Sequence, residues 1–82
     1  MTERRSRFPG LEDTAARRRA LIGELAEARQ RQGLTQTDVA ARMGTSQSAV
    51  ARLEAGELDV RLSTLDRYAA AVGVAVDWAV RR

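Results

Sequence analysis

Apolar residues recur at helical spacing in several segments of the chain, and small or polar residues separate these segments. The first segment covers residues 11 to about 32, and Gly33 follows it as a left-handed cap. Acidic residues 12 and 13 lie near its beginning, where the helix dipole favours them. The positions that we expect to face a core are Leu21, Ile22, Leu25 and Ala28.

Two short helices are predicted next, over Gln36–Met43 and from Gln47 to about Ala55. Thr35 is a suitable N-cap for the first of them, with Asp38 three residues later in an approximate capping box. Ser46 is a suitable cap for the second. The apolar positions of the two helices are Val39, Ala40 and Met43, followed by Val50 and Leu53.

A fourth helix is predicted over Thr64–Val72, after a loop that covers residues 57–62. Ser63 is the N-cap that the sequence favours, and Gly73 ends the helix. Its expected inner face consists of Leu65, Tyr68, Ala69 and Val72.

In the last segment, residues 74–82, valine and tryptophan alternate with smaller or polar residues. This alternation favours a β-strand, and a short fifth helix that begins near Asp77 is the alternative. A single strand leaves backbone groups unpaired, so we expect it to pair with the same strand of a second subunit. The expected dimer-interface residues are Val74, Val76, Trp78 and Val80.

At 82 residues, the chain is expected to form one small domain. It contains neither cysteine nor histidine, so thiolate chemistry, the commonest general base and the commonest zinc ligands are all missing. We therefore expect no enzyme, no metal and no cofactor. Neither a membrane span nor a secretory signal is recognisable, which favours a cytoplasmic protein.

Positive charge is concentrated near the beginning of the chain, although the net charge is only +3. Residues 1–34 carry five acidic residues and eight arginines: Arg4, Arg5, Arg7, Arg17, Arg18, Arg19, Arg29 and Arg31. This distribution is compatible with a polyanionic partner, or simply with a solvated helix face and tail. We expect a flexible, arginine-rich arm over residues 1–10, a domain over 11–73 and a dimerisation segment over 74–82.

The region from Gln36 to Ala55 has the spacing of a helix-turn-helix motif. Ala40 is small where the two helices would cross closely, and Gly44 lies in the turn, where a positive φ is needed. With Val50 on the inner side of the second helix, its opposite side is polar and small.

These residues resemble the Cro/repressor-type (XRE) helix-turn-helix family of phage and bacterial regulators. The similar stretch reads ARQRQGLTQTDVAARMGTSQSAVARLEAG and continues with LSTLDRYAAAVGV, within roughly residues 21–76. The resemblance implies an all-α, lambda-repressor-like domain of four to five helices, with a C-terminal strand as a further option for dimerisation. The first helix begins earlier than the family pattern does.

The resemblance also implies roles for particular residues. The helix that begins at Gln47 would lie in the major groove, and an ion pair between Arg29 and Glu54 would be buried. Gln47 is suited to a bidentate contact with adenine, and the small neighbouring residues allow close approach to base edges. The candidate DNA-binding residues are Thr35, Gln36, Ser46, Gln47, Ser48, Ala51 and Arg52.

We therefore expect a sequence-specific transcriptional regulator, most simply a homodimeric repressor that reads a palindromic operator in double-stranded DNA. The alternative is an antitoxin that binds a protein toxin and represses its own operon. A third interpretation, a purely structural dimerisation module, is disfavoured by the polar face around Gln47.

Overall fold

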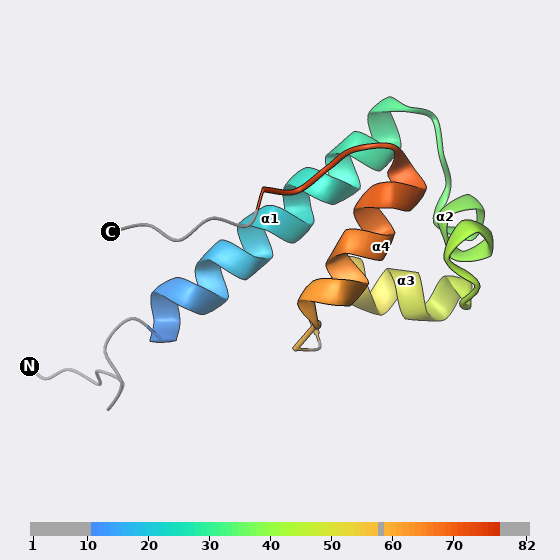
Figure 1. Ribbon diagram of the computed structural model, residues 1–82. Coiled ribbons are helices and arrows are strands. Elements are labelled where there is room, and N and C mark those ends of the chain that lie inside the picture. Colours follow the sequence, from blue (N-terminus) through green and yellow to red (C-terminus); the bar gives the residue numbers. More distant parts are fainter. Residues whose placement is uncertain (1–10, 58, 78–82) are drawn as a thin grey trace, which may run out of the picture.

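The computed structural model describes residues 11–57 and 59–77 (Figure 1). In these two ranges every regular secondary-structure element is an α-helix. The predicted all-α class is confirmed. The helices are α1 (Leu11–Arg31), α2 (Gln36–Met43), α3 (Gln47–Glu54) and α4 (Leu62–Val72). The predicted N-terminal arm, residues 1–10, lies outside the described residues.

The short helices α2 and α3 begin at side-chain caps. The Thr35 hydroxyl accepts from the Asp38 N–H at 3.0 Å, and the Asp38 carboxylate accepts from the Thr35 N–H at 2.8 Å. This reciprocal pair is a complete capping box. The Ser46 hydroxyl accepts from the Ala49 N–H at 3.1 Å. Local sequence therefore fixes where both helices of the motif begin.

The start of α4 differs from the prediction. The helix begins at Leu62, its N-cap residue is Arg61, and no side chain caps it. The Arg61 carbonyl accepts from the N–H groups of Thr64 and Leu65 at 3.0 and 3.1 Å. Burial of Leu65, which is 2% exposed, fixes the register of this first turn. Tertiary packing thus outweighs the capping preference of Ser63, which lies inside the helix.

Residues 74–77 do not form the predicted strand. The Val74 N–H donates to the Ala69 carbonyl at 2.9 Å, and the chain then passes over α1 (Figure 1). Val74 and Val76 are half-buried and pack against the helical core. These two valine side chains are therefore half-buried against helices rather than against a neighbouring strand. Trp78 and Val80 lie outside the described residues.

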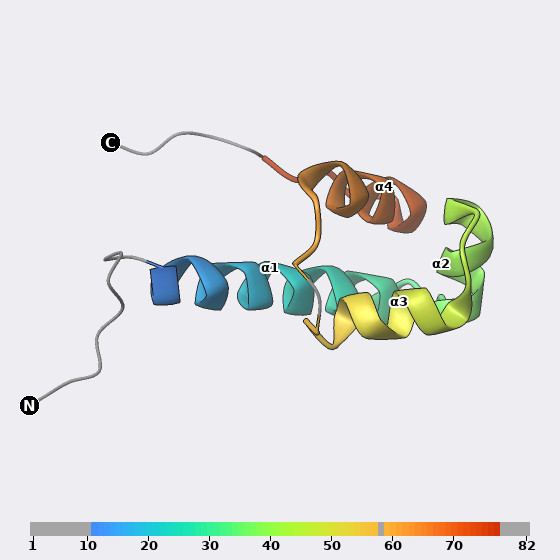
Figure 2. The same cartoon turned by 90° about the horizontal axis from the view of Figure 1, so that it is seen from below.

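The core is formed by the inner faces of all four helices. Tyr68 and Val39 are fully buried at its centre. α3 packs mainly against α2 and also contacts α1, whereas the N-terminal half of α1 extends beyond the other helices (Figures 1 and 2). The remaining buried apolar residues are Ile22, Leu25, Ala40, Met43, Val50, Leu53, Leu65, Ala69 and Val72. Across the described residues, every helix is too short or too polar to cross a membrane.

Candidate nucleic-acid interface

The turn between α2 and α3 sets the angle between the two helices. Gly44 has φ 73° and ψ 35°, in the left-handed region that favours glycine. The Thr45 N–H donates to the Ala40 carbonyl at 2.9 Å, which closes the turn. Ala40 is 3% exposed and Val50 is 1% exposed. The small side chain of Ala40 lets α3 pack closely against α2, which is the helix-turn-helix arrangement.

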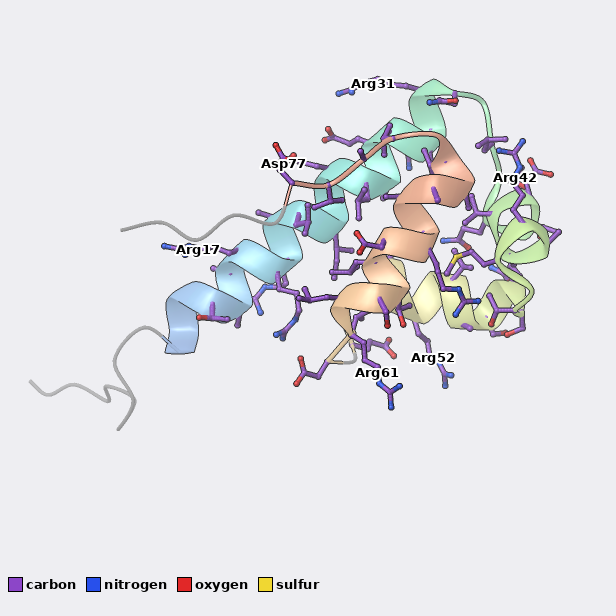
Figure 3. All side chains as sticks on the ribbon, viewed as in Figure 1. Arg17, Arg31, Arg42, Arg52, Arg61 and Asp77 are labelled. Carbon is purple, nitrogen blue, oxygen red and sulfur yellow. The ribbon has the colours of Figure 1, made fainter. Side chains whose placement is uncertain are left out.

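The outer face of α3 presents polar side chains to solvent. Val50 and Leu53 point into the core, whereas Gln47, Ser48 and Arg52 are exposed and Ala51 is half-exposed. Arg52 projects away from the body of the protein (Figure 3). The side chains on this face are short apart from Gln47 and Arg52, so it can approach another surface closely.

Behind this face, α1 and α3 are joined by a largely buried ion pair. Arg29 donates from Nε to Glu54 Oε2 at 2.7 Å and from Nη2 to Glu54 Oε1 at 3.0 Å. Its Nη1 donates to the Leu34 carbonyl at 2.8 Å, in the loop before α2. The side chains of Arg29 and Glu54 are only 10% and 9% exposed. The pair therefore ties α1, the following loop and α3 together.

A chain of amides connects this ion pair to the outer face. Gln36 donates from Nε2 to Glu54 Oε1 at 2.9 Å, and Gln47 donates from Nε2 to Gln36 Oε1 at 2.6 Å. From the core side, the Tyr68 hydroxyl donates to Glu54 Oε2. We call these five residues the Glu54 network: Arg29, Gln36, Gln47, Glu54 and Tyr68.

The electrostatics of the network favour an ionised Glu54. Burial alone would raise the pKa of Glu54, but hydrogen bonds from Arg29, Tyr68 and Gln36 outweigh it and hold the pKa below its usual value. The hydrogen bond to Glu54 raises the pKa of Arg29. Burial and the adjacent carboxylate raise the pKa of Tyr68, so its hydroxyl stays protonated and can donate. At neutral pH, Glu54 is thus a carboxylate surrounded by donors.

Two arginines connect α2 with α4. Arg67 donates from Nη2 to the Met43 carbonyl at 2.6 Å, and Arg42 donates from Nη1 to the Ala71 carbonyl at 2.7 Å. Both carbonyls belong to last turns, whose acceptors have no partner inside their own helix. These contacts hold the ends of α2 and α4 together beside the turn.

The structure brings together most of the residues singled out from the sequence. Gln36 and Gln47 are in direct contact, and the hydroxyls of Thr35 and Ser46 serve as helix caps at the beginnings of α2 and α3. Ser48, Ala51 and Arg52 share the outer face of α3. Val74 and Val76 lie apart from this face, where residues 74–77 and α1 line an open groove of about 570 Å³.

Sequence reasoning missed Tyr68, which it placed only in the core. The one signal was chemical: a buried tyrosine hydroxyl requires a hydrogen-bond partner, whereas the other core residues of α4 have no side-chain donor. Which partner it finds depends on tertiary structure. Within residues 11–57 and 59–77, the acidic side chains form no group suited to hold a metal ion.

Comparison with known proteins supports this arrangement. A family model described as Helix-turn-helix matches residues 25–78. A protein of Mycobacterium tuberculosis (strain ATCC 25618 / H37Rv), named "Putative antitoxin HigA3", is 49% identical over 55 residues. These residues are 65% of this chain and 50% of the relative, so the chain spans about half the length of that curated protein. No solved structure matches the chain.

Proposed function

The chain belongs to the Cro/repressor-type (XRE) helix-turn-helix family and is a DNA-binding protein rather than an enzyme; we propose that it is a homodimeric repressor of transcription. In this proposal, α3 enters the major groove and its outer face reads bases. The observation that carries the proposal is the position of Gln47, exposed at the beginning of α3 and held by Gln36.

The hydrogen bonds of Gln47 leave it suited to adenine. One Nε2 proton is donated to Gln36, so the second proton and Oε1 remain for a ligand. Adenine presents an acceptor at N7 and a donor at N6 in the major groove, which this amide edge matches. Ser48 is able to bond several base edges, and Ala51 is suited to a thymine methyl group. Arg52 is suited to guanine or to a phosphate.

The beginning of α2 is the proposed phosphate contact. The capping box occupies the N–H groups of Thr35 and Asp38. The N–H groups of Gln36 and Thr37 are therefore the ones that we propose to attract a phosphate. Thr35 and Gln36 lie at this end, next to Gln47 of α3. Because phosphate contacts release counterions, we expect the affinity for DNA to fall steeply as the salt concentration rises.

Dimerisation is proposed through residues 74–80, of which Val74 and Val76 lie within the described part of the chain. Two copies related by a two-fold axis would place their α3 helices about 34 Å apart, in successive major grooves of a palindromic operator. The open groove between α1 and residues 74–77 offers apolar surface from the half-buried Leu21 and Ala28 for such an interface.

The proposal is tested with DNA selected from a random duplex pool by the purified protein. We expect Gln47→Ala combined with Ser48→Ala to abolish the preference for the selected sequence and to lower the free energy of unfolding by no more than about 1 kcal/mol in total. Both side chains are exposed, and such substitutions usually change stability by about 0.5 kcal/mol or less. Failure of the wild type to enrich any sequence would refute sequence-specific repression, and a large loss of stability would make these residues structural.

A second candidate function is that of an antitoxin. It is favoured by the name of the M. tuberculosis relative and by the N-terminal half of α1, which extends beyond the other helices with Arg17 and Arg19 exposed. We expect a neighbouring small gene to arrest growth when expressed alone and not when expressed with this chain. Substitution of both arginines by glutamate would then restore the arrest without weakening operator binding. Normal growth with every neighbouring gene would exclude this function.

A further inference from the structure

We infer that Tyr68 is a positioning residue for base recognition: its hydroxyl, presented from the core side of α4, orients the Glu54 carboxylate and thereby the amides of Gln36 and Gln47. This inference rests on the proposed role of Gln47 in reading DNA. It assigns a part in recognition to a fully buried residue that cannot touch the DNA.

Glu54 receives hydrogen bonds from three other helices. Its Oε2 accepts from the Tyr68 hydroxyl of α4 and from Arg29 Nε of α1 at 2.7 Å. Its Oε1 accepts from Arg29 Nη2 at 3.0 Å and from Gln36 Nε2 of α2 at 2.9 Å. A carboxylate offers about four lone-pair sites, so these four donors occupy it completely. The carboxylate therefore has one favoured rotation about its terminal bond.

The charge of Glu54 determines which way the side-chain amides of Gln36 and Gln47 point. A carboxylate accepts and never donates, so Gln36 must turn its Nε2 towards Glu54. Its Oε1 then faces Gln47, which must in turn offer Nε2. As a result, Gln47 presents Oε1 and its remaining proton on the outer face. Each step depends on the preceding one.

The Tyr68 hydroxyl is the donor that defines which oxygen remains for Gln36. Without it, Oε2 has Arg29 Nε as its one remaining donor, and the carboxylate is able to tilt about its two Arg29 contacts, so that Oε1 shifts relative to Gln36 Nε2. Gln36 still turns Nε2 towards Glu54, but its amide is held less firmly, and the amide of Gln47 gains freedom with it. A less firmly held Gln47 offers its amide edge to adenine for a smaller part of the time, so base discrimination falls although the fold and the phosphate contacts persist.

Packing alone does not call for a tyrosine at this position. Tyr68 is 0% exposed, and a phenylalanine of nearly the same shape would fill the same volume without a polar group to satisfy. The hydroxyl adds a directional contact with Glu54 and no contact with solvent. This makes Tyr68→Phe a narrow perturbation that removes one donor and keeps the ring.

The test compares wild type and Tyr68→Phe on three duplexes: the selected operator, the same operator with the adenine opposite Gln47 replaced, and an unrelated sequence. We expect the ratio of the first two affinities to fall about five- to tenfold, within the range set by one bidentate contact. Affinity for the unrelated duplex should change less than about twofold. Unchanged discrimination in a folded Tyr68→Phe protein would overturn the inference.

Val72→Ala is the matched control for stability. Val72 is buried on the same helix, at 1% exposure, and takes no part in the Glu54 network. Its truncation should lower the melting temperature without altering discrimination. If Val72→Ala reduces discrimination as strongly as Tyr68→Phe does, the effect is one of general destabilisation and the inference fails.

Nuclear magnetic resonance of the wild type decides the matter if Tyr68→Phe does not fold. We expect a slowly exchanging Tyr68 hydroxyl proton and cross-relaxation between the side-chain amide protons of Gln47 and the side chain of Gln36. A rapidly exchanging hydroxyl with a freely rotating Gln47 amide would overturn the inference. A wild-type protein that prefers no DNA sequence would refute the proposed function itself. If instead the wild type is selective and Tyr68→Phe is equally selective, only the inference about Tyr68 fails.

Discussion

Arg29→Met is the substitution for which the structure gives the largest expected effect. Methionine keeps an unbranched apolar stem in the same space but removes all three polar contacts of the guanidinium, with Glu54 at 2.7 and 3.0 Å and with the Leu34 carbonyl at 2.8 Å. The Glu54 side chain is only 9% exposed, so little water can replace the lost partner. In the variant, the nearly buried carboxylate of Glu54 therefore has no cation beside it.

Removing one partner of a buried ion pair costs about 3–5 kcal/mol. A chain of 82 residues has a total free energy of unfolding of about 4–12 kcal/mol, so this loss is a large fraction of the whole. At about 4–8 °C per kcal/mol for a domain of this size, the melting temperature should fall by at least about 12 °C. Urea unfolding followed by circular dichroism at pH 7 measures the change directly.

The control for this variant is Arg31→Met, on the same helix. Arg31 pairs with Glu27 at 3.3 Å, but the side chains of the two residues are 75% and 64% exposed. Such a surface pair contributes little, and we expect a change below about 0.5 kcal/mol. The two variants thus differ mainly in the burial of the pair that each one breaks.

The cost of Arg29→Met should also depend on pH. Without the arginine, fewer hydrogen bonds oppose the effect of burial, so the pKa of Glu54 is higher in the folded variant than in the folded wild type, and, as the pH falls, the variant takes up a proton at a higher pH. Its deficit relative to the wild type should then narrow. A deficit below about 1 kcal/mol at pH 7, or one that is the same at pH 4 and pH 7, would refute the account of Glu54 as a buried carboxylate.

Two further predictions concern stability. In the wild type, the pKa of Glu54 and that of Asp38 are lowered in the folded state, the latter by its hydrogen bonds with Thr35. The stabilisation that these two carboxylates give the folded state is therefore complete above pH 4.5, the ordinary pKa of a glutamate, and is lost as the pH falls further. Urea midpoints measured between pH 2.5 and 7 should show this loss, and the midpoint of Glu54→Gln should depend less steeply on pH. Gly44→Ala should destabilise the protein by about 1–2 kcal/mol because alanine is strained at φ 73°. Gly23→Ala, in the middle of α1, should stabilise the protein by about 0.5–1 kcal/mol. Equal effects of the two substitutions in thermal unfolding would contradict the role assigned to Gly44 in the turn.

The sequence predicted the motif well because its signals are local. The bounds of α2 were predicted as they stand, since Thr35 and Asp38 cap one end and Gly44 ends the other. The predicted start of α4 was wrong because burial of Leu65 sets the first turn, and burial is a property of the whole fold. In the same way, alternating valines at 74 and 76 suggested a strand, but their partners are helices.

The candidate site was predictable in part. The outer face of α3 follows from helical periodicity once Val50 is assigned to the core. The contacts of Glu54 with Arg29, Gln36 and Tyr68 span 25, 18 and 14 positions of sequence, and no local pattern encodes them. The direction of each amide depends on these contacts, so the orientation of Gln47 became visible only in three dimensions.

The central claim, that the outer face of α3 reads DNA, is tested most directly by titrating the isotopically labelled protein with its selected duplex and recording the amide resonances. The account predicts that the largest shifts occur at the side-chain amide of Gln47 and at the backbone of Ser48 and Arg52, with small shifts in the C-terminal half of α4. Large shifts confined to α1 and α4, with the Gln47 amide unmoved at saturation, would contradict it.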